Sequence, residues 1–167
     1  MYDARYAEEQ SVKYQAALKH LDITRPDSVL DVGCGTGLFF SHIAAEAKTV
    51  VGVDISSRLL LQAKERIRDF CNVNLIQADA DYLPLIDKSF CFVFAFTVLQ
   101  NLPNPLQTLK EIKRIAKLDA HIIVTGLKKV FSLEDFKVLL RNTGLQVVYL
   151  EDSALKCHVA VMMQNQV

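Results

Sequence analysis

Three glycines and two aspartates in the first half of the chain have the spacing of a ligand site built on backbone loops. The segment VLDVGCGTGLFF holds Gly33, Gly35 and Gly37 within five residues. Gly33 permits a sharp turn, Gly35 lets the backbone approach a ligand, and Gly37 lets the following helix pack closely on a sheet. Asp54 follows a Val-rich run about twenty residues later, where a carboxylate can accept both hydroxyls of a ribose. Asp79 follows the next such run and can accept the amino group of an adenine.

Other interpretations of these residues stay open. Glycines at this position also make a purely structural strand-to-helix turn, and a strand-end aspartate also caps helices. Ser56 is available as that cap, which leaves Asp54 for the ribose. A nicotinamide dinucleotide domain is less favoured, because the spacing is GxGxG and Leu38 stands where the last glycine of GxGxxG belongs.

Alternating strand-like and helix-like segments place these residues at one edge of a sheet. Seven Val-rich or aromatic runs predict strands at 28–33, 49–55, 73–78, 90–96, 120–126, 145–150 and 156–163. Amphipathic stretches predict helices at 37–46, 56–70, 105–118 and 132–144, after a helical opening. The alternation predicts an α/β fold with a mostly parallel sheet and helices on both faces. Only EDSAL separates the last two runs, so they should form an antiparallel hairpin.

Composition limits the classes of protein that fit. The 167 residues are 51% hydrophobic and predict one domain over 1–167, with 1–25 as a helical N-terminal lid. Lys plus Arg equals Asp plus Glu at 19 each, so net charge does not indicate nucleic-acid binding. No apolar run reaches the ~20 residues of a membrane span, and the polar N-terminus is not a signal peptide. We therefore expect a cytoplasmic protein without a membrane partner.

The four cysteines do not predict a metal site or a disulfide framework. They are widely spaced and form no CxxC pair. We expect all of them to behave as small buried hydrophobic residues in a reducing compartment. They are Cys34, Cys71, Cys91 and Cys157.

Taken together, VLDVGCGTG, VVGVDIS and ADADYLPLIDKSFCFVFAFTVLQNLPNP resemble the class I, seven-stranded S-adenosylmethionine-dependent methyltransferases. The similarity extends from about Ser28 to the C-terminus. The third segment contains D-x-x-x-LP from Asp79 and then Asp87, a pattern that sheet packing does not demand. The resemblance implies a Rossmann-like, doubly wound sheet of order 3-2-1-4-5-7-6 with an antiparallel last strand. It also implies an enzyme with S-adenosylmethionine as methyl donor and S-adenosylhomocysteine as product.

The resemblance further implies which residues bind each part of the donor. At its methionine end, Asp31 supports the amino group, often through water, and the three glycines with Cys34 lie against the chain. Thr97, at the end of the fourth strand, faces the same end through its main chain.

At the nucleoside end, the resemblance places Asp54 on the ribose and Ile55 against the adenine ring. It places Asp79 on the adenine amino group, and the backbone N–H of Ala80 on the ring.

The expected reaction requires a catalytic base only where the acceptor carries a proton that must leave early. Methyl transfer from a sulfonium is an in-line displacement with an excellent leaving group, so positioning supplies much of the rate. Acceptor-side candidates are Gln100 and Asn101 after the fourth strand, and Tyr14 in the opening helix. Asn104-Pro105 resembles the start of an NPPY signature but lacks the aromatic residue, so a helix N-cap is the better interpretation.

The acceptor itself is not assigned by the sequence. About 25 residues of lid and short loops elsewhere favour a bulky or macromolecular acceptor, or an activating protein partner that completes the site. A non-catalytic, methyltransferase-like subunit that binds the cofactor or supports a partner is the alternative. A basic row could meet an acidic surface or be an ordinary solvated face. It comprises Lys110, Lys113, Arg114 and Lys117, with Lys128 and Lys129.

Overall fold

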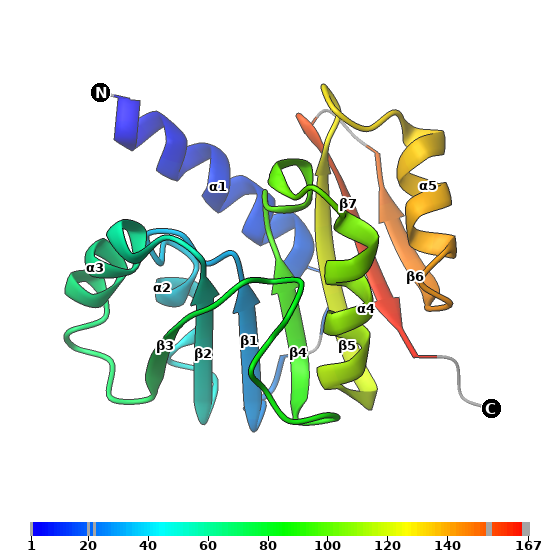
Figure 1. Cartoon of the computed structure of the whole chain (residues 1–167). Helices are drawn as coiled ribbons and strands as arrows, with labels where there is room; N and C mark the ends of the chain where they lie inside the picture. Colours follow the sequence, from blue (N-terminus) through cyan, green and yellow to red (C-terminus); the bar gives the residue numbers. More distant parts are fainter. Residues whose placement is uncertain (1, 20, 22, 153–154, 165–167) are drawn as a thin grey trace.

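Seven strands form a single twisted sheet of order β3-β2-β1-β4-β5-β7-β6 (Figure 1). The computed structural model describes residues 2–19, 21, 23–152 and 155–164, and for residues 2–7 it describes the backbone alone. The strands are β1 (Ser28–Val32), β2 (Thr49–Asp54), β3 (Val73–Gln77), β4 (Phe90–Ala95), β5 (Ala116–Leu127), β6 (Gln146–Glu151) and β7 (Cys157–Met163). The first five pair in parallel, and β7 is antiparallel to β5 and β6. The predicted strand order and final hairpin are confirmed.

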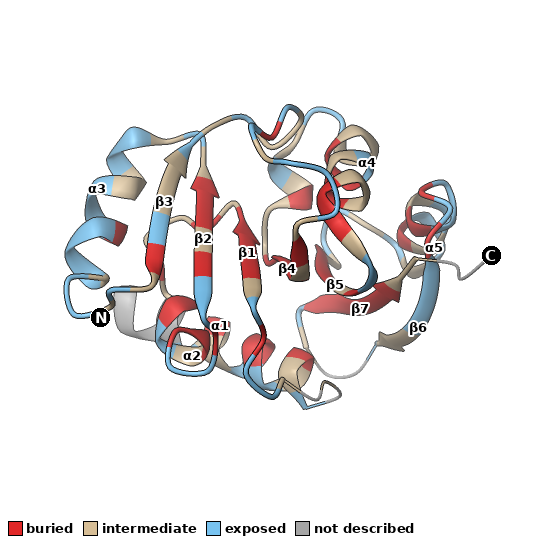
Figure 2. Ribbon diagram, turned by 90° about the horizontal axis from the view of Figure 1, so that it is seen from below, coloured by how far each residue is buried: buried red, intermediate tan, exposed pale blue. Residues whose placement is uncertain are grey.

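Helices cover both faces of the sheet (Figures 1 and 2). They are α1 (Tyr2–Leu18), α2 (Phe40–Ile43), α3 (Ser57–Arg66), α4 (Pro105–Ile115) and α5 (Leu133–Arg141), with a 3-10 turn η1 (Leu99–Asn101). One core cluster joins the sheet to α1, α2 and α3, and a second joins its other face to α4 and α5. The described part of the chain contains no helix long and apolar enough to cross a membrane.

The helix starts follow local capping. Ser56 Oγ accepts a hydrogen bond from the N–H of Leu59 at 3.3 Å, as the sequence predicted. Asn104 caps α4 through the N–H of Gln107 at 3.2 Å, with Pro105 in the first turn. The interpretation of Asn104-Pro105 as a helix N-cap is therefore confirmed. Ser132 caps α5 in the same way.

Several helices are shorter than their patterns predicted. The helix expected at 37–46 covers only Phe40–Ile43, because Gly37 has φ +76°, which an α-helix does not accommodate. The helix expected at 105–118 ends at Ile115, because Ala116 already pairs with Phe90 across β4 and β5. The N-terminal helix ends at Leu18, short of residue 25.

The expected basic row does not form as a continuous helix face. Lys117 lies in β5, where its Nζ donates to Cys91 Sγ at 3.3 Å. Lys113 donates to the Thr143 carbonyl, and Arg114 pairs with Glu111 at 2.8 Å. These side chains make contacts within the molecule, so they do not support an acidic docking partner.

The expectation that all cysteines are buried is wrong for two of them. Cys34 and Cys157 are buried, whereas Cys71 is exposed and Cys91 is half-buried. Cys71 lies just before β3, beyond the buried part of that strand, so no core surrounds it.

A register shift between β4 and β5 decides which aromatic side chains face the ligand edge. The register with β5 shifts between Phe90 and Phe92, so Phe90 packs with the α4 and α5 side. Phe92, Phe94 and Phe96 pack on the opposite face with α1 and α2. This alternation brings Phe96 and the following Thr97 to the carboxyl end of β4.

Candidate functional site

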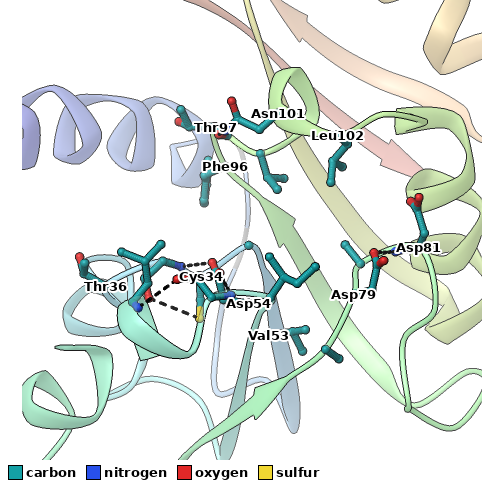
Figure 3. A pocket seen from close by; sticks show the side chains of 18 of the residues that line it. Cys34, Thr36, Val53, Asp54, Asp79, Asp81, Phe96, Thr97, Asn101 and Leu102 are labelled. Carbon is teal, nitrogen blue, oxygen red and sulfur yellow. Dashed lines mark hydrogen bonds between the residues drawn. The ribbon is translucent and has the colours of Figure 1, made fainter. Parts of the chain in front are cut away.

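A cavity of about 550 Å³ lies at the carboxyl ends of the central parallel strands (Figure 3). Most of the residues predicted from the sequence line it: Tyr14, Gly33, Cys34, Gly35, Asp54, Ile55, Asp79, Ala80, Thr97 and Asn101. Asp31, Gly37 and Gln100 are not among the lining residues. The strand-end loops therefore meet at one site, as ligand sites of open α/β sheets do.

The glycine loop is held in place by β2. The N–H groups of Gly33 and Cys34 both donate to the Val53 carbonyl, at 2.7 and 3.0 Å. Gly35 has φ +55°, and a Cβ atom there would meet nothing within 4 Å. At Gly37 a Cβ would instead collide with the Phe40 ring at 2.7 Å, so that glycine serves packing and not the cavity wall. Only the Gly35 backbone therefore has free space for a ligand beside it.

Asp54 connects the glycine loop to the start of α3. Its Oδ2 accepts the N–H of Gly35 at 2.8 Å, and its Oδ1 accepts the N–H of Ser56 at 2.9 Å. A carboxylate offers about four lone-pair sites, so each oxygen can still accept one ligand hydroxyl. The side chain is thus fixed in place and can still bind a diol. Ile55 beside it is 67% exposed, which leaves an apolar surface for a ring.

Asp79 stands in a turn that α4 holds from behind. Its Oδ1 accepts the N–H of Asp81 at 2.9 Å and the side chain is exposed. Asp81 in turn accepts the Thr108 hydroxyl, and its carbonyl accepts Gln107 Nε2 at 3.3 Å. The second oxygen of Asp79 is engaged by no described side chain and suits a ligand amino group (Figure 3).

Asp87 has a structural explanation. Its carboxylate pairs with Arg114 at 2.5 Å, and the same guanidinium donates to the carbonyls of Leu83 and Leu85, each at 2.9 Å. The sequence pattern that sheet packing did not demand therefore includes an anchor for the loop between β3 and β4. Asp87 is not among the cavity-lining residues.

Thr97 adopts a backbone conformation that a β-branched residue rarely accepts, with φ +57°. Its N–H donates to Thr125 Oγ1 at 2.7 Å, and its hydroxyl donates to Gln10 Oε1 at 3.1 Å. Its carbonyl accepts Gln100 Nε2 at 2.5 Å and Asn101 Nδ2 at 3.2 Å. Strain of this kind persists where neighbours over-determine it, and it concentrates at functional sites.

Gln100 does not have the location expected of an acceptor-side residue. Its amide holds the Thr97 carbonyl and lies outside the cavity wall, whereas Asn101 lines the cavity. The reason is the 3-10 turn Leu99–Asn101, which folds the Gln100 side chain back on the strand end.

Asp31 lies beneath the loop and is 2% exposed. Burial raises its pKa well above the ordinary 3.8, and the nearby charge of Asp54 raises it further. Burial also raises the pKa of the Cys34 thiol, and the charges of Asp31 and Asp54 raise it further. Cys34 is therefore not a thiolate nucleophile. A positive ligand group nearby would favour the charged form of Asp31.

Tyr14 brings α1 to the cavity. It is 6% exposed, and its ring lies 4.8 Å from Phe96 and 5.0 Å from Phe39, measured between centroids. The sequence did not identify the other wall residues, which come from several separate segments: Thr36, Leu38, Val53, Ser56, Leu59, Ala78, Asp81, Phe96, Val98, Leu102 and Pro103. In the sequence, the apolar residues among them have the pattern of ordinary core residues. Of the polar ones, Asp81 lies in a motif that the sequence analysis singled out, the DxxxLP segment.

The charged side chains around the cavity fit a positively charged nucleoside. No Lys, Arg or His is among the described residues that line the cavity, whereas Asp54, Asp79 and Asp81 are. A sulfonium and an ammonium match this set, and a pyrophosphate would instead require donors. The described residues include no group of three His, Cys, Asp or Glu that could hold a metal ion.

Sequence comparison identifies related proteins. A family model described as a methyltransferase domain matches residues 30–124, more than half of the chain. The chain is 32% identical over 130 residues to malonyl-[acyl-carrier protein] O-methyltransferase of Marinomonas sp., covering 77% of this chain and 48% of the relative. It is 31% identical over 119 residues to demethylmenaquinone methyltransferase of Staphylococcus saprophyticus, covering 70% and 51%. The chain thus spans about half the length of the curated relatives it matches.

Solved structures share the fold. A SAM-dependent methyltransferase from Aquifex aeolicus aligns with TM-score 0.82 at 22% identity, covering 91% of this chain and 89% of that one. A Haloferax volcanii putative methyltransferase in complex with the activator Trm112 aligns with TM-score 0.82 at 16% identity, covering 99% and 96%. At these identities the likeness concerns the fold alone.

Proposed function

The chain belongs to the methyltransferase domain family, whose class I fold uses S-adenosylmethionine as methyl donor, and we propose that the cavity binds this donor for methyl transfer to an uncharged acceptor. Asp54 carries the proposal, because its carboxylate is fixed by Gly35 and Ser56 and keeps free lone pairs toward the cavity. Ile55 and Asp79 then receive the adenine ring and its amino group. Thr97 and the glycine loop receive the methionine end, with Asp31 beneath.

The reaction follows from placement. The bound donor supplies a methyl group on a sulfonium, and the protein has to exclude water and align the acceptor in line. Tyr14 and Asn101 line the cavity and are our candidates for its acceptor side. Neither is required as a base for an acceptor that loses its proton easily.

The cavity wall favours an uncharged acceptor over an anionic one. Phe96, Val98, Leu102 and Pro103 make this wall apolar, and no described cationic side chain lines it. Relatives are named for malonyl-[acyl-carrier protein] and for demethylmenaquinone. Of these two, the apolar and cation-free wall better suits a quinone-like ring than a free carboxylate. The unpaired cysteines support a reducing, cytoplasmic location, which belongs to the same proposal.

Titration calorimetry with S-adenosylmethionine and S-adenosylhomocysteine tests donor binding. We expect micromolar affinity in the wild type and a loss of at least about 100-fold in Asp54→Ala, which removes both the diol acceptor and the loop anchor. Asp69→Ala, at an exposed aspartate in the turn after α3, is the matched control and should bind as the wild type does. A folded wild-type protein that binds neither compound would refute the proposal.

A second candidate is a domain that works only with a protein partner. Tyr82 and Ile86 in the loop after β3 are 74% and 81% exposed, and this loop continues from cavity residues Asp79 to Asp81. The Haloferax neighbour was solved with an activator protein, which makes this arrangement worth testing. This candidate would be favoured if the chain alone bound the donor but methylated no uncharged acceptor, and if an added partner protein restored methylation.

A further inference from the structure

We propose that Gln10 of α1 is a positioning residue that holds the strained Thr97 turn at the methionine end of the cavity. The inference rests on the proposed function, because it concerns how the same cavity binds its donor. Gln10 is not itself a cavity-lining residue, so it acts through Thr97.

The surroundings of Gln10 do not favour a polar side chain for packing alone. The residue is 2% exposed, and its Nε2 has no hydrogen-bond partner. An unpaired buried amide group costs free energy that a leucine or methionine at this position would avoid. The one contact that uses the amide is Oε1, which accepts the Thr97 hydroxyl at 3.1 Å.

Helix α1 holds Gln10 at a defined place. The neighbouring Glu9 bridges Lys13 at 3.1 Å and Lys156 at 2.6 Å, which ties the helix to the start of β7. Lys13 is 2% exposed, and Tyr14 packs in the aromatic cluster with Phe39 and Phe96. Gln10 therefore approaches Thr97 from a docked helix and not from a loose segment.

Thr97 needs this contact because of its backbone. Its φ of +57° is held by Thr125 on the N–H and by Gln100 and Asn101 on the carbonyl. Gln10 is the partner of its hydroxyl, so it alone among these contacts comes from outside the sheet and its following turn. Without it, the χ1 angle and the turn are less restrained.

The consequence is confined to one end of the ligand. Thr97 follows β4, whereas the nucleoside end is built by Asp54 and Ile55 at the end of β2 and by Asp79 after β3. Gln10 has no hydrogen bond to those residues. A change at Gln10 should therefore weaken recognition of the amino-acid end and spare the nucleoside.

Two ligands separate these ends. S-adenosylhomocysteine carries the amino-acid end, and 5′-methylthioadenosine has the same nucleoside and thioether without it. For Gln10→Met, which removes the amide at nearly constant volume, we expect affinity for S-adenosylhomocysteine to fall on the order of tenfold, with affinity for 5′-methylthioadenosine unchanged. Gln15→Met, the same change at an exposed site of α1, should alter neither. Calorimetry with melting temperatures for each variant makes the measurement.

A double-mutant cycle with Thr97→Val tests whether Gln10 acts through the hydroxyl. Because both changes break the same hydrogen bond, the double variant should bind S-adenosylhomocysteine about as the single variants do. Additive losses, equal losses for both ligands, or unchanged binding by Gln10→Met would each overturn the inference. A wild-type protein that binds neither ligand would instead refute the proposed function itself, and the positioning role with it.

Discussion

Asp31 is a carboxyl group buried inside a strand, next to a second carboxylate. Burial and the charge of Asp54 both raise its pKa, so the charged form is unfavourable in the folded chain. An apolar or amide side chain at this position would make the folded chain more stable. We infer that Asp31 is retained for a positive ligand group, at the expense of stability without that ligand.

Asp31→Asn should therefore stabilise the free protein at neutral pH. The folded pKa lies above the ordinary 3.8, so the stability of the wild type falls as pH rises from 3.8 through the folded pKa. The variant does not lose stability in this way. At pH 7 its melting temperature should be higher than that of the wild type by about 2–4 °C for each 1 kcal/mol of unfolding free energy gained. Below pH 3.8 the two proteins should melt alike.

The same variant should bind S-adenosylhomocysteine on the order of tenfold more weakly, because the counter-charge is gone. Calorimetric melting and titration of the same preparation check both effects. Asp69→Asn, at an exposed position, is the control. A lower melting temperature in Asp31→Asn at pH 7 would contradict this account of the buried charge.

Helix α4 supports the site from outside the cavity. Arg114 near its end donates to the Leu83 and Leu85 carbonyls and pairs with Glu111 and Asp87. Glu111 also accepts the Leu83 N–H at 3.0 Å. Since this loop follows the Asp79 turn, α4 connects the stability of the fold to the geometry of the turn that we propose for the adenine.

Arg114→Met should loosen that loop. We expect a loss of about 2 kcal/mol in the free energy of unfolding, because two carbonyls and two carboxylates lose a shared donor, and a melting temperature about 4–8 °C lower. Donor binding should weaken as well, by a few-fold, as the Asp79 turn becomes less ordered. Lys110→Met on the exposed face of α4 provides the comparison. If both variants melt alike, the loop does not depend on Arg114.

Across the whole molecule, two ion-pair groups connect peripheral segments to neighbouring elements: one joins α1 to Lys156 before β7, and the other joins α4 to the loop between β3 and β4. Hydrogen bonds from Lys156 and Lys13 lower the pKa of Glu9 in α1, and a hydrogen bond from Arg114 lowers that of Glu111 in α4. Both carboxylates have an ordinary pKa of 4.5. Their stabilising effect is therefore complete above pH 4.5 and is lost as pH falls through the lower folded pKa.

The double variant Glu9→Gln, Glu111→Gln should show this dependence. At pH 6 we expect it to be less stable than the wild type by about 1 kcal/mol or less for each pair, since both are partly solvated. The difference should shrink as pH falls from 4.5 through the lowered folded pKa of each group, because the wild-type carboxylates then become protonated. Urea unfolding at a series of pH values measures it. A difference that stays constant down to pH 3 would show that packing, and not charge, is responsible.

The sequence by itself determined the strands of the sheet and the half of the cavity that we propose for the nucleoside. Parallel strands and the loops that follow them are local in sequence, so the glycines, Asp54 and Asp79 come together once strand order is known. The caps Ser56, Asn104 and Ser132 are equally local, since each bonds a backbone group three residues away.

Only the tertiary structure decided which side chains support Thr97, at the end of the cavity that we propose for methionine. Gln10 and Thr97 are 87 residues apart, and nothing in either neighbourhood marks them as partners. The aromatic pattern of the fourth strand could not show the register shift between Phe90 and Phe92, because register depends on the neighbouring strand. Lys117 and Asp87 likewise bind partners on other elements, Cys91 and Arg114. Periodicity identifies which face of an element is buried, whereas the partner of each polar side chain depends on how the elements pack.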